Sequence, residues 1–445
     1  MDAVEKYLAR YAEPEAEIAR SIRGSYGAAL IVPACQESIA LLDGYREAAL
    51  GAPGRLLVIL VVNAGLEADV GVHTANQALL AALGERFPDA ERLDRSDVSF
   101  LPPARLASDS AFDLLWVDRA SQSFRLPEQQ GVGLARRIGT DIALALYRAG
   151  KLGSPWLFGS DADAVLPCDY FKVQGDPDAA ALLYPFVHVP GGDPDVDQAT
   201  QLYEISLRYY TLGLAWAGSP YAYHSIGSTF AVGAESYAMV RGFPKRTAGE
   251  DFYLLDKLAK LGPLCRVSTD PVRIISRRSE RVPFGTGRRV AEIALLAQEG
   301  SEQKLYNPEV FSGLNSWLTA LERFVSHRDV AELKKELGAA RSGLGQRALG
   351  AAESLGALDE LALAARQSPK TAVLRRRLHT WFDALRTLRL IHGLRDSGSI
   401  ALPYREALGI APFTAEVAQI DAPDELARSL AKLELRLGRR VGVTV

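Results

Sequence analysis

The chain has 445 residues, of which 48% are hydrophobic and 24% charged, the balance of an ordinary globular protein. Its formal net charge of −3 argues against a nucleic-acid-binding protein, and its length favours two to three domains. Three cysteines lie too far apart for a zinc site or a disulfide framework, which indicates a reducing, cytoplasmic compartment.

The first twenty residues, "MDAVEKYLARYAEPEAEIAR", are charged and have helical periodicity, without the apolar core of a signal peptide. We expect residues 1–25 to form an N-terminal helical segment. The apolar run "LLVILVV" at 56–62 is too short to cross a bilayer. The sequence therefore predicts no transmembrane segment, while a peripheral contact with a membrane surface stays open.

Strand-like and helix-like segments then alternate up to about residue 290. Strands are predicted at 28–34, 55–64, 113–120, 155–163 and 180–189, and helices near 74–83 and 131–150. This alternation predicts an α/β domain at 26–290, with a mixed, mostly parallel sheet flanked by helices. In such sheets ligands bind beyond the carboxyl ends of the strands. The residues at predicted strand ends are Pro33, Ala34, Asn63, Asp161 and Asp163.

After residue 290 the segments are helical and rich in Ala, Leu, Arg and Glu. Ser368 and Pro369 form a helix-start signal before "KTAVLRRRLHTW". We expect a separate helical C-terminal domain at 291–445.

Asp161 and Asp163 follow an apolar strand and precede a proline turn, in "WLFGSDADAVLP". One interpretation is a simple turn, in which aspartate is common. The other is a cation site, because Mg²⁺ and Mn²⁺ bind in proteins through one or two carboxylates together with substrate phosphates. The position behind a strand favours the cation site.

Two further segments contain candidate functional residues. Glu250 and Asp251 begin an apolar helix, where the helix dipole alone favours acidic residues, but Asp251 could also act as a catalytic base. The segment 277–289 contains Arg277, Arg278 and Arg281. It is either a solvated basic loop or a phosphate clamp whose glycines allow it to close as a lid.

Four motifs occur in an order that resembles the family-2-type nucleotide-sugar glycosyltransferases of the GT-A fold, over about residues 26–290. They are "VPACQE", "ARRIG", "SDADAVLPCDYF" and "GSTFAVGAESYAMVRGFPKRTAGEDFYLLDKL". The family usually has asparagine at the positions of Gln36 and Arg137, and an Asp-Asp-Gly-Ser strand end where this chain has "VVNAG".

The resemblance implies a GT-A, Rossmann-like sheet and a role for each matching residue. Asp161 and Asp163 would hold a divalent cation, Mg²⁺ or Mn²⁺, with Asp161 also facing the ribose. Asp251 would deprotonate an acceptor hydroxyl beside Glu250. The nucleoside diphosphate, of UDP or GDP type, would be bound by Pro33, Ala34, Glu37, Asn63, Arg136 and Arg137.

The expected reaction is therefore metal-dependent transfer of a sugar to a hydroxyl acceptor with inversion of the anomeric carbon. One alternative is a retaining GT-A transferase of the mannosylglycerate-synthase kind. A nucleotidyltransferase is disfavoured because no loop rich in glycine and in lysine or arginine follows the first strand. A non-catalytic sugar-nucleotide-binding scaffold remains an alternative of a different class.

Overall fold

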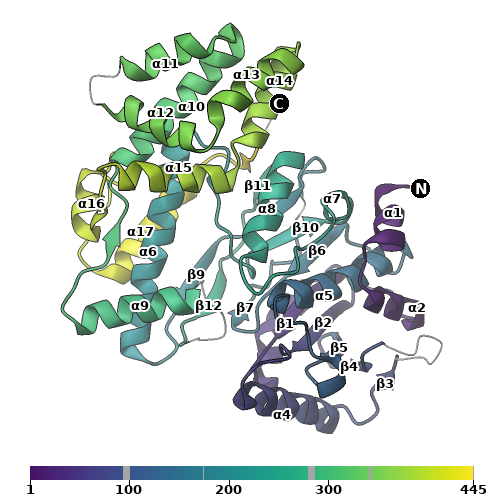
Figure 1. Ribbon diagram of the computed structural model, residues 1–445. Coiled ribbons are helices and arrows are strands. Elements are labelled where there is room, and N and C mark those ends of the chain that lie inside the picture. Colours follow the sequence, from purple (N-terminus) through teal and green to yellow (C-terminus); the bar gives the residue numbers. More distant parts are fainter. Residues whose placement is uncertain (94–100, 174, 279–285, 340–342, 444–445) are drawn as a thin grey trace. The chain divides into compact units, whose positions relative to one another are not determined.

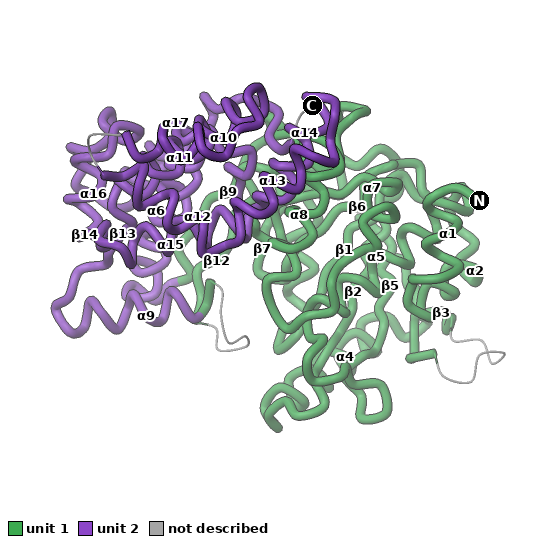
Figure 2. The backbone as a smooth tube through the Cα atoms, turned by 45° about the horizontal axis from the view of Figure 1, so that its top comes forward, with its two compact units in different colours: residues 1–191, 225–287 green, residues 192–224, 288–445 purple. Residues whose placement is uncertain are grey.

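The computed structural model of the chain describes residues 1–93, 101–173, 175–278, 286–339 and 343–443. It divides into two compact units (Figure 2). Unit 1 comprises residues 1–191 and 225–287, and unit 2 comprises 192–224 and 288–445. Residues 192–224 thus group with the C-terminal helices, although the sequence analysis assigned them to the α/β domain.

Unit 1 is built on a mixed sheet. Among its described strands the order is β11-β8-β10-β6-β1-β2-β5-β4-β3. Neighbours β6, β1, β2 and β5 are parallel, whereas β10 is antiparallel to β6 and β8, and β4 to β5. The bounds are β1 (Ala28–Ala34), β2 (Leu56–Asn63), β3 (Glu91–Arg92), β4 (Ala104–Ser108), β5 (Asp113–Arg119), β6 (Trp156–Gly159), β8 (Ala181–Leu183), β10 (Phe230–Gly233) and β11 (Leu264–Arg266).

The central strands form because their sequences are apolar, except for Asn63 at the end of β2. Every residue of β1, "AALIVPA", and of β2, "LLVILVVN", is buried. Continuous apolar strands are typical of parallel sheets covered on both faces. Their register pairs Ala28 with Leu56 and Ala34 with Val62, so both strands end at the same edge of the sheet. The strands predicted near 28–34, 55–64 and 113–120 are confirmed.

Helices cover this sheet, and α5 lies across β1 and β2 (Figure 1). The approach is close because Gly139 faces the sheet: a Cβ there would lie 2.7 Å from Ile31 Cγ2. The described helices of unit 1 are α1 (Ala3–Arg10), α2 (Ile18–Ser21), α3 (Arg46–Leu50), α4 (Val70–Arg86), α5 (Gly131–Arg148), α7 (Ala234–Met239) and α8 (Glu250–Leu261), with 3₁₀ turns at Pro14–Glu17, Ile39–Tyr45 and Gln122–Phe124.

The single strand predicted at 180–189 is wrong. The structure has two strands there, β8 and β9 (Phe186–Val189), in different sheets. Pro185 lies between them and has no N–H group to continue a ladder. Strand β9 instead pairs with β12 (Val272–Ile275), which also pairs with β7 (Ala164–Val165). This small sheet fixes the segment that follows Asp163.

Unit 2 is helical. Its described helices are α6 (Pro194–Trp216), α9 (Thr286–Gln298), α10 (Glu309–His327), α11 (Val330–Gly338), α12 (Leu344–Ser354), α13 (Ala357–Gln367), α14 (Thr371–Trp381), α15 (Ala384–Asp396), α16 (Tyr404–Ile410) and α17 (Pro423–Glu434). The short strands β13 (Lys304–Leu305) and β14 (Leu402–Pro403) pair with each other, and β15 is Arg440–Val441.

A buried ionic network joins α6 to α17 within unit 2. The Arg208 side chain is 2% exposed and pairs with Glu204 of its own helix and with Glu434 of α17. His224 Nε2 lies 2.7 Å from the same Glu434 carboxylate. Burial opposes ionisation of Glu434, but His224 and Arg208 outweigh it and lower its pKa. This network explains why α6 belongs with the C-terminal helices.

The described helices include none whose length and hydrophobicity would suit a bilayer-spanning segment. The fold class agrees with the sequence analysis in its broad outline: a large mixed sheet with parallel central strands is followed by a helical C-terminal region.

Candidate functional site

Several predicted site residues meet at the carboxyl ends of the central strands in unit 1. Glu37 follows β1, Asn63 ends β2, and Asp161 and Asp163 follow β6. Arg277 comes two residues after β12 and pairs with both Glu37 and Asp163. Residues far apart in the sequence thus form one polar cluster at the sheet edge.

The segment from Gly159 to Asp163 is held by hydrogen bonds to its backbone. Tyr170 donates its hydroxyl to the carbonyl of Gly159 (2.8 Å), and Tyr45 donates to the carbonyl of Asp161 (3.0 Å). The backbone N–H of Ile275 in β12 donates to the carbonyl of Asp163 (3.0 Å). These hydrogen bonds hold the backbone and do not involve the side chains of Asp161 and Asp163, which pair with Arg136 and Arg277.

Arg136 connects Asp161 to the start of α8. Its guanidinium is 4% exposed and pairs with Glu250 (2.8 Å) and with Asp161. It also donates to the carbonyls of Ser160 (3.2 Å) and Gly227 (3.3 Å). Burial acts against the charged guanidinium, but nearby carboxylates outweigh it and raise the pKa of Arg136. Arg136 is therefore a permanent cation inside the cluster.

Arg277 forms the second bridge of the cluster. Its Nη2 lies 2.8 Å from Glu37 Oε1 and 2.7 Å from Asp163 Oδ2. Its Nε donates to Asp163 Oδ2 (2.8 Å), and its Nη1 donates to Glu37 Oε2 (3.0 Å). Burial opposes its charge, and the two carboxylates outweigh burial and raise the pKa of Arg277.

Asp251 is partly exposed and lies beside Glu250 at the head of α8. Its Oδ1 accepts a hydrogen bond from the N–H of Phe252 (2.7 Å). Burial, and after it the charge of Glu250, raise the pKa of Asp251 above its usual range, while Arg136 acts in the opposite direction. A carboxylate with a raised pKa is a better proton acceptor than an ordinary aspartate.

The charge of the cluster suits a divalent cation. Its five carboxyls belong to Glu37, Asp161, Asp163, Glu250 and Asp251. In the described part of the cluster, the positive charges paired with them are the guanidiniums of Arg136 and Arg277. No group of three or more His, Cys, Asp and Glu in the described ranges is arranged to hold a metal. Mg²⁺ and Mn²⁺ need only one or two carboxylates when phosphates complete the shell, so Asp161 and Asp163 fit.

Asn76 is a site residue that the sequence analysis missed. It is fully buried in α4; its Oδ1 accepts from the N–H of Gln36 (2.8 Å), and its Nδ2 donates to the carbonyl of Asn63 (2.8 Å). Gln36 has a left-handed backbone, φ 57°, which a non-glycine residue rarely adopts. Asn63 Nδ2 donates in turn to the carbonyl of Ala34 (3.0 Å). The two asparagines therefore fix the loop that carries Glu37.

Other predicted residues are placed differently. Arg137 points away from Asp161: its guanidinium donates to the carbonyls of Tyr11 and Phe243 and pairs with Glu13. Pro33 and Ala34 are buried in β1, and Arg278 is exposed beside Arg277. Arg281 and most of the predicted lid lie outside the described residues. His224 is hydrogen-bonded to Glu434 within unit 2 and takes no part in the cluster.

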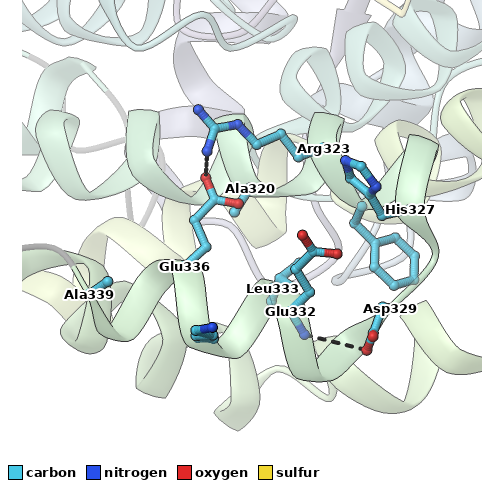
Figure 3. A pocket seen from close by; sticks show the side chains of 10 residues that line it. Ala320, Arg323, His327, Asp329, Glu332, Leu333, Glu336 and Ala339 are labelled. Atoms are coloured by element: carbon cyan, nitrogen blue, oxygen red, sulfur yellow. Dashed lines mark hydrogen bonds and ion pairs between the residues drawn. The ribbon is translucent and has the colours of Figure 1, made fainter.

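Unit 2 contains a separate surface pocket of about 470 Å³ between α10 and α11 (Figure 3). Two of its lining charges have partners within its walls: Arg323 reaches across to Glu336, and Asp329 accepts from the N–H of Glu332 (Figure 3). Asp329 thereby caps α11. These contacts belong to the packing of α10 and α11, and the pocket is separate from the site in unit 1.

The comparison with known proteins found no relative, so the proposal below is argued from the geometry of the cluster. No protein-family model matches the chain, and no curated protein matches it.

Proposed function

We propose that this protein transfers a sugar from a nucleoside-diphosphate sugar of UDP or GDP type to an acceptor hydroxyl, on a GT-A-type domain. The observation that supports this proposal is the cluster at the carboxyl ends of the strands. Carboxylates from the β1 loop, the β6 loop and the head of α8 are joined there by two arginines. Ligands of open α/β sheets bind at this edge.

In this proposal Asp161 and Asp163 bind a divalent cation. When bound, the cation would neutralise charge on the departing nucleoside diphosphate. Glu37 and the loop fixed by Asn63 and Asn76 would border the nucleotide. Arg136 would hold Asp161 and Glu250 in place rather than contact phosphate, because its donors already have protein partners.

Asp251 is the proposed base. It would accept the proton of the acceptor hydroxyl while the oxygen attacks the anomeric carbon and the bond to the diphosphate breaks. A single displacement of this kind inverts the anomeric configuration. Burial raises the pKa of Asp251, which favours this role.

The first test addresses donor binding. We expect Asp163→Asn to weaken Mn²⁺-dependent binding of UDP or GDP at least about tenfold, because a cation ligand is lost. Asp89→Asn, an exposed aspartate in unit 1, is the charge-matched control and should bind as wild type. Isothermal titration with and without Mn²⁺ measures both. Equal affinity in Asp163→Asn and wild type would refute the cation role.

The second test addresses the base. We expect Asp251→Asn to bind UDP or GDP normally but to transfer sugar about 10²–10⁴-fold more slowly, since the amide cannot accept a proton. A panel of nucleotide sugars and hydroxyl acceptors must first identify a productive pair. A product with the donor's anomeric configuration would replace the inverting mechanism by the retaining alternative. Nucleotide binding without any transfer would favour the scaffold.

A further inference from the structure

The two arginines of the cluster are held in different ways. Arg136 comes from the interior of α5, is 4% exposed, and donates to two backbone carbonyls besides its carboxylates. Arg277 stands beyond the end of β12, and its side chain is 30% exposed. The hydrogen bonds described for its guanidinium go to Glu37 and Asp163. Arg136 is thus built into the interior, whereas Arg277 can exchange these partners for a ligand.

Arg277 already contacts one of the two oxygens of the carboxylate that the proposed cation would bind. Asp163 Oδ2 is 2.8 Å from Nε and 2.7 Å from Nη2 of Arg277. At the same distance, a divalent ion repels a guanidinium twice as strongly as a monovalent ion would. The guanidinium in its described position therefore competes with a divalent cation for the Asp163 carboxylate.

We infer that Arg277 is an exchangeable counter-ion: it neutralises Glu37 and Asp163 in the free protein and transfers to the donor diphosphate when a divalent cation takes Asp163. This inference rests on the proposed function. It gives the arginine a phosphate partner in the bound state, and a planar guanidinium binds phosphate oxygens as well as carboxylates. The exchange involves ion pairs only and no covalent step.

The exchange predicts two effects of opposite sign when the guanidinium is removed. Mn²⁺ alone should bind more tightly, because its competitor at Asp163 is gone. Nucleoside diphosphate in the presence of Mn²⁺ should bind less tightly, because a phosphate partner is gone. A residue that merely braced the loops would, on removal, weaken both. A clamp that never paired with Asp163 would leave the affinity for Mn²⁺ unchanged.

The experiment titrates Mn²⁺ alone, and then UDP and GDP at saturating Mn²⁺, into wild type, Arg277→Gln and Arg277→Lys. Arg273→Gln is the matched control, since Arg273 is exposed on β12, the strand that precedes Arg277, and its substitution removes the same charge. We expect Arg277→Gln to bind Mn²⁺ roughly tenfold more tightly and the nucleotide roughly tenfold less tightly, about 1.4 kcal/mol each way. Arg273→Gln should match wild type in both titrations.

The outcomes separate the inference from the proposed function. Unchanged or weaker Mn²⁺ binding in Arg277→Gln overturns the exchange even if wild type binds nucleotide. If Arg277→Gln does not fold, Arg277→Lys decides: an ammonium cannot fork between both carboxylates, so Mn²⁺ affinity should rise several-fold, and no rise overturns the exchange. If no form of the protein binds UDP or GDP, the proposed function and the phosphate step both fail, while tighter Mn²⁺ binding in Arg277→Gln still supports the competition.

Discussion

At the residue scale, Asp141 shows how a buried carboxyl is accommodated away from the candidate site. It has no exposed surface in α5 and accepts hydrogen bonds from Tyr7 (2.8 Å), Tyr237 (2.9 Å) and the N–H of Glu13 (2.8 Å). These contacts attach the N-terminal segment and α7 to α5. Burial nevertheless raises the pKa of Asp141 to about 7.

The raised pKa predicts a pH-dependent stability. The folded protein binds the Asp141 proton more tightly than the unfolded chain, so the contribution is present below about pH 4 and is lost as the pH rises through about 7. Asp141→Asn cannot titrate. We expect the stability of wild type relative to Asp141→Asn to fall by about 2 kcal/mol between pH 5 and pH 7.5, measured by urea unfolding. The same difference at both values would show that Asp141 is ionised in the fold throughout.

At the element scale, the packing of α5 on β1 and β2 depends on a missing side chain. A Cβ on Gly139 would lie 2.7 Å from Ile31 Cγ2, and neither a helix nor a strand of the central sheet can easily shift. We expect Gly139→Ala to lower the unfolding free energy by about 1–3 kcal/mol. Gly84→Ala in α4 is the control: nothing lies within 4 Å of its Cβ, so it should gain about 0.5–1 kcal/mol from helix propensity. Stabilisation by both substitutions would contradict the close approach.

Elements could be predicted from the sequence where their signal is local. Strands β1 and β2 are continuous apolar runs, and α5 has helical periodicity over its whole length, so each was expected close to its observed bounds. The division of 180–189 into β8 and β9 depends on which neighbours each half meets. Those neighbours, β10 and β12, come 40 or more residues later, and no pattern within the segment reports them.

The candidate site was predictable only in part, for the same reason. The carboxylates behind β6 stand out because charge follows an apolar strand. Arg277 meets Glu37 across 240 residues, and nothing in either segment identifies the partner. In the sequence, Asn76 is an ordinary polar residue of a helix. Its role comes from its hydrogen bonds to Gln36 and Asn63, which lie near it only in the folded chain.

At the scale of the whole molecule, the two units should respond separately to substitution. We expect Glu434→Gln to lower the stability of unit 2 by about 2–4 kcal/mol. Both Arg208 and His224 lose a buried, charged partner, although Arg208 keeps its ion pair with Glu204. The Mn²⁺-dependent nucleotide binding that we propose for unit 1 should not change. Thermal unfolding and titration measure the two effects.

The control is Glu416→Gln, whose side chain is 65% exposed and pairs with Arg436 at the surface of unit 2. It should change stability by less than about 0.5 kcal/mol. Loss of nucleotide binding in Glu434→Gln at a temperature where it remains folded would show that the donor site extends beyond unit 1.

The ionic network of α6 also has a consequence for synthesis on the ribosome. Arg208 and Glu434 are 226 residues apart, so at about 5–20 residues per second the arginine is made roughly 10–45 s before its distant partner. During that interval Glu204, one helical turn away, is its available carboxylate. The apolar residues of α6 also meet partners that are made later: Tyr209 packs on Phe311 of α10 and on Phe413. We expect nascent chains halted in this window to be bound by chaperones at α6.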